Sequence, residues 1–294
     1  MGRTAPGAGG RRAGGPGGRN GPDPGAASRH RAHHLRHRRR EDERLIDLKG
    51  KRAFITGGTR GIGLATAELL VRSGARVALG YRSRRADADA AVAKVGNGAV
   101  AIAGDLGEPA TARGAVEEAV RALSGLDILV VNHGLWPPQD VPLSRMTDAQ
   151  WESTRRANYD AAFYVCRAAI PHLSTGGKIV LVSSTAGQRG EAFHADYGAA
   201  RGGVIAFTKS LAVELAPGIN VNCVAPGWVD TEMAAVPYLR DGGKGRRDIE
   251  AGIPLKRVAS VEDVAGPIVF LCSDLARHIT GEILNVNGGS VLCG

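Results

Sequence analysis

The chain has 294 residues, 43% of them apolar and 23% charged, which is enough for one large α/β domain with a substantial core. Its formal net charge of +9 lies in the first 40 residues, which contain ten Arg, no Lys and one Asp. Of the chain's 38 basic and 29 acidic side chains, 28 of each lie in the remaining residues. The folded part of the chain is therefore not expected to be a basic nucleic-acid-binding module.

Residues 1–44 are rich in Gly, Pro and Arg and have almost no large apolar side chains. Such a segment cannot bury enough apolar surface to order itself, so we expect a disordered basic tail followed by one domain over residues 45–294. Residues 29–40 are a candidate for non-specific contact with nucleic acid or another anionic surface. A solvated extension is the favoured interpretation.

The sequence also bears on location and metal binding. No stretch has the apolar core of a secretory signal or the length of a membrane span, so we expect a soluble, cytoplasmic protein. The four cysteines lack C-x-x-C spacing and are expected to be reduced. The histidines of the tail have no cysteine partners, so no metal site is expected.

From residue 48 onwards, short apolar runs alternate with amphipathic segments. The pattern predicts strands at 52–56, 76–79, 99–103, 128–132, 178–183, 220–224 and 282–286, with the longest helices at 61–73, 109–123, 148–173 and 195–215. Continuous apolar strands separated by helices indicate a parallel sheet covered on both faces. The expected fold is therefore a doubly wound, seven-stranded Rossmann arrangement.

The turn between the first strand and the first helix reads TGGTRGIG, from Thr56 to Gly63. Gly57, Gly61 and Gly63 allow a tight turn, close approach to a pyrophosphate and close helix packing. Thr59 and Ile62 belong to the same predicted site. The spacing differs from the commoner G-x-G-x-x-G, but the strand and helix on either side still predict dinucleotide binding.

The end of the second strand indicates which dinucleotide is bound. An NAD-specific fold places an acid there to hold the ribose diol, whereas residues 80–84 contain none. Arg60 and Arg82 are predicted to converge on a 2′-phosphate, with Ser83 donating a hydrogen bond. This pattern favours NADP, and Arg84 and Arg85 are interpreted as solvent-exposed.

Polar residues also follow the third and fourth strands. Asp105, followed by Leu106, is placed to accept from the adenine amino group, or else begins the next helix. Asn132 contacts the cofactor or bridges two strands, and Gly134 leaves room beside the adenosine ribose. His133 is interpreted as a packed or solvent-tipped histidine without a catalytic role.

The chemistry is expected at the end of the fifth strand and on the helix after it. Ser183 and Ser184 end that strand, and parallel sheets bind ligands at this edge. Tyr197 and Arg201 are four residues apart, so they share one helical face, and the cation favours the phenolate form. Asn158 either holds a water that leads to solvent or is a satisfied core amide.

Several of these motifs occur in one order at suitable separations: the glycine turn, the 132–134 turn, Asn158, Ser184 and the Tyr197–Arg201 pair. Together they resemble the short-chain dehydrogenase/reductase family, in its subgroup similar to 3-oxoacyl-(acyl carrier protein) reductases. The resemblance implies that Tyr197 protonates the carbonyl oxygen as hydride arrives, while Ser184 holds that oxygen and Asn158 anchors a relay water. It further implies that Tyr197 and Arg201 contact the cofactor and that the nicotinamide is lined by Pro226, Gly227, Val229 and Thr231. A homotetramer or dimer is also implied.

One residue departs from the family pattern. Tyr197 is followed four positions later by Arg201 instead of lysine, and arginine does not readily release a proton. The leading interpretation is an NADP-dependent reductase of a ketone, such as a 3-oxoacyl thioester or a polyketide-like carbonyl. The alternatives are an alcohol or sugar dehydrogenase working oxidatively and an NADP-binding protein with weakened catalysis. Residues 232–255 are expected to be a mobile segment that covers the substrate.

Overall fold

The computed structural model describes residues 45–293, with only the backbone described at Arg240 and Asp241. The predicted basic tail, residues 1–44, lies outside the described residues, and both its disorder and the domain boundary remain predictions. Within residues 45–293, none of the helices has the length and apolar character that crossing a membrane requires. The same residues bring together no trio of His, Cys, Asp or Glu side chains suited to a metal ion.

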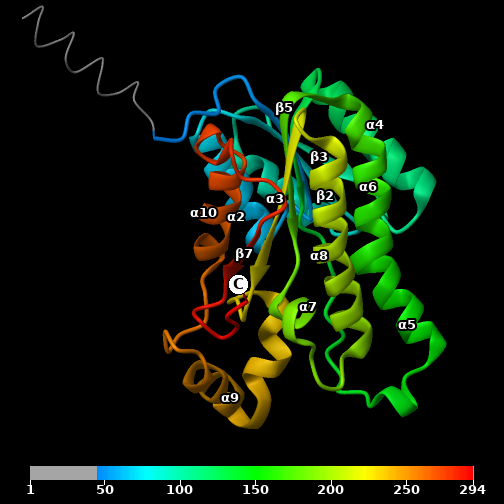
Figure 1. Ribbon diagram of the computed structural model, residues 1–294, viewed down its shortest axis with the longest axis vertical. Helices are drawn as coiled ribbons and strands as arrows, with labels where there is room; N and C mark the ends of the chain where they lie inside the picture. The colour runs from blue at the N-terminus through cyan, green and yellow to red at the C-terminus, as the bar shows by residue number, and fades with distance from the viewer. Residues whose placement is uncertain (1–44, 294) are drawn as a thin grey trace, which may run out of the picture. The chain divides into compact units, whose positions relative to one another are not determined.

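Seven parallel strands form one sheet in the order β3-β2-β1-β4-β5-β6-β7 (Figure 1). They are β1 (Arg52–Thr56), β2 (Arg76–Tyr81), β3 (Val100–Ala103), β4 (Leu126–Val131), β5 (Leu173–Val182), β6 (Ile219–Pro226) and β7 (Ile283–Val286). The predicted seven-stranded Rossmann arrangement is therefore confirmed. The strand order reverses between β1 and β4, and in such sheets a crevice for ligands opens there at the carboxyl ends.

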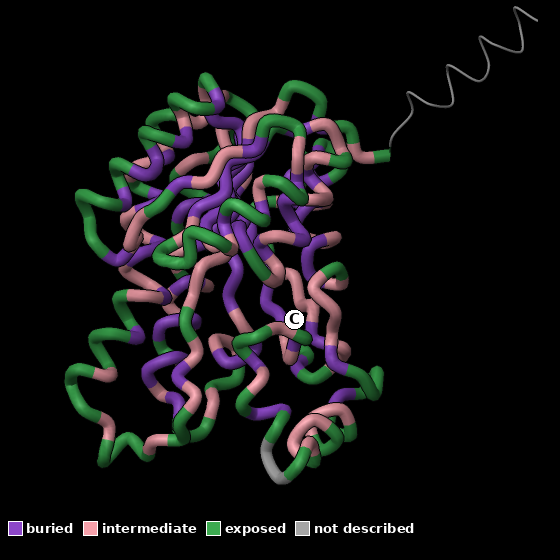
Figure 2. Tube along the Cα trace, turned by 180° about the vertical axis from the view of Figure 1, so that it is seen from behind, coloured by how far each residue is buried: buried purple, intermediate pink, exposed green. Residues whose placement is uncertain are grey.

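Helices cover both faces of this sheet. They are α2 (Gly61–Arg72), α3 (Arg85–Val95), α4 (Pro109–Leu123), α5 (Asp148–Arg155), α6 (Ala161–Ala169), α7 (Thr185–Arg189), α8 (Ala195–Leu215), α9 (Ala235–Gly252) and α10 (Val261–Leu271). In β1, Ala53 and Ile55 pack toward α2, α3 and α10, whereas Phe54 packs toward α4, α6 and α8. This alternation follows from the pleat of a strand buried on both sides. Figure 2 shows the buried strands between more exposed outer surfaces.

The helix predicted over residues 148–173 is confirmed as a continuous helical run up to His172, but it is not a uniform α-helix. It is divided into α5, a π-helical turn (Arg156–Asp160), α6 and a 3₁₀ turn (Ile170–His172). Pro171 lacks the N–H that would continue α6, and the chain enters β5 at Leu173. The predicted bounds of α4 and α8 are confirmed.

The segment after β6 is more regular than its weak periodicity suggested. A 3₁₀ turn (Glu232–Ala234) leads into the 18-residue α9, which Figure 1 places at the same end of the molecule as α7. Gly242 and Gly243 interrupt α9 with φ values of 64° and 88°, conformations that favour glycine. The segment is thus largely helical, and its expected mobility over a substrate stays a prediction.

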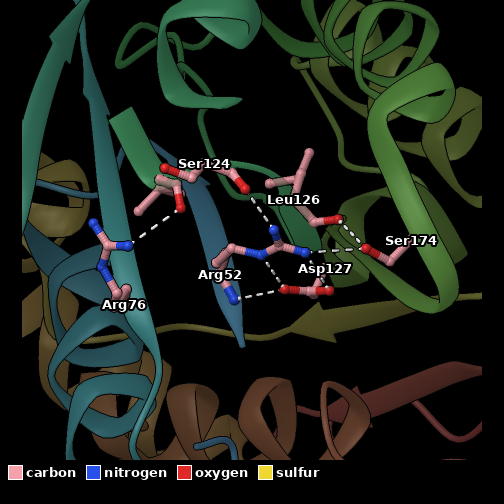
Figure 3. A network of polar contacts seen from close by, with 7 residues as sticks. Arg52, Arg76, Ser124, Leu126, Asp127 and Ser174 are labelled. Carbon is pink, nitrogen blue, oxygen red and sulfur yellow. Dashed lines mark hydrogen bonds and ion pairs between the residues drawn. The ribbon is translucent and has the colours of Figure 1, made fainter. Parts of the chain in front are cut away.

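An ion pair holds the opposite end of the sheet together (Figure 3). Arg52 at the start of β1 donates from Nε and Nη2 to the two carboxylate oxygens of Asp127 in β4, at 2.7 and 3.0 Å. Its Nη2 also donates to Ser174 in β5 and its Nη1 to the carbonyl of Ser124. Side-chain bonds therefore cross-link β1, β4 and β5 at the end of the sheet opposite the candidate site.

Candidate active site

The glycine turn is packed so closely that side chains are excluded from it. A β-carbon on Gly63 would lie 2.1 Å from the carbonyl oxygen of Gly57 and 2.7 Å from Nδ2 of Asn132. Gly57 itself has a φ of 61°. A bare backbone at this turn is the cradle that a pyrophosphate requires at a helix N-terminus, so these residues fit a dinucleotide.

Asn132 ties the turn to β4. Its Nδ2 donates to the carbonyl oxygens of Thr56 and Gly57, at 3.3 and 3.1 Å. The structural bridge considered for Asn132 is therefore confirmed, and its contact with cofactor stays a prediction. His133 accepts or donates through Nδ1 with the Thr56 hydroxyl at 2.8 Å, while its Nε2 is buried without a partner. The interpretation of His133 as a packed residue is confirmed.

Asp105 closes a turn after β3. Its carboxylate accepts from the backbone N–H of Gly107 at 3.0 Å and from Nη2 of Arg156 at 2.9 Å. The alternative that Asp105 begins the next helix is wrong, because α4 starts at Pro109 with Glu108 before it. Its predicted role toward adenine remains open to experiment, as does that of Leu106.

The segment after β6 crosses the glycine turn. The methyl group of Thr231 lies 3.5 Å from where a β-carbon on Gly61 would be. The hydroxyl of Tyr238 donates to the carbonyl oxygen of Val229 at 3.0 Å, which fixes α9 to this segment. Gly227 packs against Asn287, where a β-carbon would come within 3.1 Å. Pro226, Gly227, Val229 and Thr231 therefore belong to one segment that runs from the end of β6 to the glycine turn, and their contact with a nicotinamide stays a prediction.

Two arginines meet beside the same turn. Arg60 and Arg84 each donate from Nη1 to one carboxylate oxygen of Glu232, at 2.8 and 3.0 Å. Arg60 was predicted to pair with Arg82, and Arg84 was predicted to be solvent-exposed. Arg84 is exposed as predicted, but it meets Arg60 through this shared acid. The sequence contained no signal for the link, because Glu232 lies 148 residues beyond Arg84.

Ser184 ends the run of β5 and begins α7. Its hydroxyl oxygen accepts from the backbone N–H of Ala186 at 3.2 Å and so caps that short helix. The neighbouring Ser183 donates from Oγ to the carbonyl oxygen of Arg201 at 2.8 Å. A β-carbon on Gly187 would lie 2.6 Å from the backbone of Arg201, so α7 and α8 cross at close range. The predicted serine pair is thereby brought next to Arg201 on α8.

Arg201 is buried, with 4% of its surface exposed. It donates from Nη1 to the carbonyl oxygen of Val182 at 2.9 Å, and its Nε has no partner. Its guanidinium carbon lies 5.3 Å from the centre of the Tyr197 ring, so the cation sits over the phenol face. The shared helical face predicted for Tyr197 and Arg201 is confirmed.

Asn158 lies in the π-helical turn, a kind of irregularity often found at functional sites. Its Oδ1 accepts from the backbone N–H of Leu135, and its Nδ2 donates to the carbonyl oxygens of Leu135 and Thr154. The side chain is therefore a satisfied buried amide that holds the segment after Gly134. Its role in anchoring a relay water stays a prediction.

Asp196 was not singled out from the sequence. It is buried directly before Tyr197, where Oδ1 accepts from the tyrosine's backbone N–H at 2.9 Å. Its Oδ2 accepts from Thr154 at 2.8 Å and from Gln150 at 3.1 Å. This carboxylate fixes the start of α8 to α5, so it positions the tyrosine. An acid directly before the tyrosine predicted to be catalytic is a signal that could have been followed.

Aromatic side chains surround Tyr197 and were also missed. Trp136 meets the Tyr197 ring edge-on with centroids 4.8 Å apart and lies 4.1 Å from the His194 ring. The Trp228 ring lies 6.2 Å from the Trp136 ring, and the Tyr238 ring lies 5.9 Å from the Trp228 ring, centre to centre. These four residues and Tyr197 are called the aromatic group below. A tryptophan two residues after the Asn132–Gly134 turn was the available signal.

The glycine turn, the 132–134 turn and Arg201 form one continuous series of contacts. A β-carbon on Gly57 would meet Asn132 at 3.2 Å, and one on Gly134 would meet Arg201 at 1.8 Å. The dinucleotide cradle thus adjoins the tyrosine, which defines a nucleotide-dependent oxidoreductase on a Rossmann scaffold.

Residues 57–290 match a family model described as enoyl-(acyl carrier protein) reductase. The chain belongs to the short-chain dehydrogenase/reductase family and is an oxidoreductase acting on CH–OH or carbonyl groups.

Curated relatives and solved structures agree with this assignment. The chain is 38% identical over 250 residues to 3-oxoacyl-[acyl-carrier-protein] reductase from Aquifex aeolicus, covering 83% of this chain and 98% of that protein. A glucose/ribitol dehydrogenase-type structure from Brucella melitensis superposes with a TM-score of 0.79 at 34% identity, covering 84% of this chain and 99% of that one. A short-chain dehydrogenase from Burkholderia cenocepacia, solved with NADP, gives 0.76 at 36% identity, with coverages of 83% and 98%.

Proposed function

We propose that the chain is an NADP-dependent reductase that converts a ketone to a secondary alcohol by hydride transfer. The observation that carries the proposal is the position of the Arg201 guanidinium, 5.3 Å from the Tyr197 ring centre and beside the 132–134 turn that adjoins the glycine cradle. A phenol held by a fixed cation beside a nucleotide site suits proton transfer at a carbonyl oxygen.

The choice of NADP rests on charge. Arg60 and Arg84 already converge on one carboxylate oxygen, so they can converge on a 2′-phosphate in the same way. Arg82 and Ser83 lie on the same loop and belong to the proposed phosphate site. The absence of an acid at residues 80–84 removes the usual partner of an NAD ribose.

The bound nicotinamide supplies the hydride, and the protein's residues handle the oxygen and the proton. Tyr197 donates its phenolic proton to the oxygen that gains charge, and Ser184 donates a hydrogen bond to the same oxygen. Arg201 stabilises the phenolate left behind. Asp196 and Asn158 keep α8 and the segment after Gly134 in register, and Asn158 is proposed to anchor the water that restores the proton.

The aromatic group bears on the substrate. Trp136 contacts Tyr197, and Trp228 and Tyr238 extend this apolar surface away from it, which favours a ketone with a flat or apolar body. A polyketide-like carbonyl fits this description, and a 3-oxoacyl thioester is the candidate suggested by the Aquifex relative. A cytoplasmic homo-oligomer, as a tetramer or dimer, completes the proposal.

The test is an NADPH absorbance assay with a panel of aryl ketones, cyclic ketones and 3-oxoacyl thioesters. We expect turnover with NADPH, and loss of at least about a hundredfold in kcat for Tyr197→Phe. Tyr164→Phe, which changes a tyrosine packed on Phe163 and Arg167 away from the site, is the matched control. NADPH binding without turnover of any ketone, unchanged by Tyr197→Phe, would reject the reductase in favour of a nucleotide-binding protein. Oxidation of alcohols with NADP⁺ in strong preference to reduction would favour the dehydrogenase.

A further inference from the structure

The link between Arg60, Arg84 and Glu232 joins the proposed phosphate site to the segment that covers the site. Both guanidinium groups donate to the same oxygen, Oε2 of Glu232. The two guanidinium groups therefore lie close together, and the Glu232 carboxylate binds both of them. Like charges repel, and the carboxylate between the two guanidinium groups offsets that repulsion, while Asp87 also contacts Arg84 at 3.4 Å.

All three side chains are accessible to solvent. Their exposed fractions are 54% for Arg60, 57% for Arg84 and 65% for Glu232. Exposed ion pairs of this kind stabilise a protein only weakly, so a stronger anion can replace the carboxylate. A phosphate monoester carries between about −1.5 and −2 charge and three acceptor oxygens, whereas a carboxylate carries −1.

Glu232 also lies at a sensitive place in the chain. It follows Thr231, whose methyl group lies over Gly61, and begins the 3₁₀ turn that leads into α9. Its bond to Arg60 and Arg84 consequently fastens this segment across the mouth of the dinucleotide turn. A phosphate that took its place would leave the Glu232 carboxylate beside a like charge, and the segment would be released.

We propose that Glu232 is a specificity-determining residue that occupies the 2′-phosphate position and is displaced by NADP but not by NAD. The inference rests on the proposed use of NADP. Glu232 lowers the affinity for the phosphorylated cofactor, and its displacement couples recognition of the 2′-phosphate to movement of residues 231–252. Binding of the unphosphorylated cofactor leaves the bond in place and the segment fastened.

The first test measures dissociation constants by calorimetry for NADPH, NADH, 2′,5′-ADP and 5′-AMP with the full chain. For Glu232→Gln we expect the Kd of NADPH and 2′,5′-ADP to fall about three- to tenfold, because two exposed ion pairs no longer compete. The Kd of NADH and 5′-AMP should change less than about twofold. Glu214→Gln removes an equal charge near the end of α8, just before β6 begins and so at the far end of the sheet, and should change none of the four.

The second test follows amide hydrogen exchange over residues 231–252. Addition of 2′,5′-ADP should speed exchange there, addition of 5′-AMP should not, and Glu232→Gln should exchange fast without any nucleotide. An unchanged or weaker affinity of Glu232→Gln for 2′,5′-ADP, or equal effects of the two nucleotides on exchange, would overturn the proposal.

Failure of the underlying cofactor assignment gives a different result. Arg60→Ala and Arg84→Ala would then leave the ratio of NADPH to NADH affinity unchanged, and 2′,5′-ADP would bind no better than 5′-AMP to any variant. Because these readouts need no substrate, they are also independent of which ketone is reduced.

Discussion

A β-carbon on Gly134 would lie 1.8 Å from Nη2 of Arg201, so the guanidinium occupies the space that any other residue at position 134 would need. Gly134→Ala must therefore displace a buried cation that lies over the Tyr197 ring. We expect kcat/KM for ketone reduction to fall at least about a hundredfold, because a misplaced catalytic group is this costly. Steady-state kinetics with NADPH check the prediction.

The control for this variant is Gly114→Ala on the exposed side of α4. No atom lies within 4 Å of a β-carbon there. Alanine should raise the free energy of unfolding by about 0.5–1 kcal/mol and leave kcat/KM unchanged. Equal kinetics for Gly134→Ala and Gly114→Ala would contradict the packing described for Arg201.

Replacement of Arg201 separates its charge from its ability to release a proton. Arg201→Gln should lower kcat at least about a hundredfold, because the phenolate loses its cation. Arg201→Lys should raise kcat about tenfold, since an ammonium group can pass on a proton whereas a guanidinium does not. Turnover by all three enzymes is measured with one ketone at saturating NADPH. If Arg201→Gln kept the native kcat, the cation would have no catalytic role.

His133 should make stability depend on pH without affecting the chemistry. Burial, aided by the nearby positive charge of Arg201 and opposed by Asp105, lowers the pKa of His133 from 6.5 to about 3. Between these values the unfolded chain binds a proton that the folded chain does not, so acidification destabilises the fold by about 1.4 kcal/mol per pH unit. Urea unfolding at pH 5, 6 and 7 should show this slope reduced in His133→Asn. Parallel pH dependences for the two proteins would show that the imidazole is protonated when folded.

Trp136 should discriminate between substrates. Its ring meets Tyr197 edge-on, so removing it takes an apolar surface away from the catalytic phenol. For Trp136→Ala we expect KM to rise about tenfold for aryl ketones and less than about threefold for a small aliphatic ketone. Trp151→Ala, an exposed tryptophan on α5, serves as the control. Equal losses on both substrate types would assign Trp136 a purely structural role.

The ion pair between Arg52 and Asp127 should contribute stability at neutral pH. Burial opposes ionisation of Asp127, but hydrogen bonds from Arg52 and Ser174 outweigh it and lower its pKa below 3.8. The ion pair therefore makes its full contribution to the free energy of unfolding above about pH 4. That contribution is lost as the pH falls through the lowered pKa of Asp127. Arg52→Leu should lose about 2–3 kcal/mol of unfolding free energy at pH 7, with a smaller difference below pH 4. Arg52→Lys should lose less, and a pH-independent difference would exclude the ion pair as the cause.

Much of this fold could be predicted because it depends on the pattern of apolar residues within short stretches of the sequence. Apolar runs predicted all seven strands, and the bounds of β1, α4 and α8 were right to the residue. The spacing of Tyr197 and Arg201 placed them on one helical face, as the structure bears out. These features depend on residues that are close in the sequence, where helix and strand geometry dictate the outcome.

Features that depend on distant residues could not be predicted in this way. The partner of Arg60 and Arg84 is an acid more than a hundred residues later, and its position follows from the path of the chain after β6. The π-helical turn at Asn158 arises where α5 meets α8 and the 134–135 segment, a tertiary constraint that no local pattern records. The aromatic group likewise assembles from three separate segments.

The strand order has a consequence for biosynthesis. By residue 131 a nascent chain already contains β3, β2, β1 and β4, so the nucleotide cradle acquires its sheet neighbours before the tyrosine has been translated. The side of β1 that carries Ala53 and Ile55, however, is only partly covered by α2 and α3 until α10 completes the same cluster. A ribosomal stall or a stop codon before residue 261 would consequently leave the apolar surface that α10 covers exposed to solvent. We expect such a chain to be bound by chaperones before it binds a coenzyme.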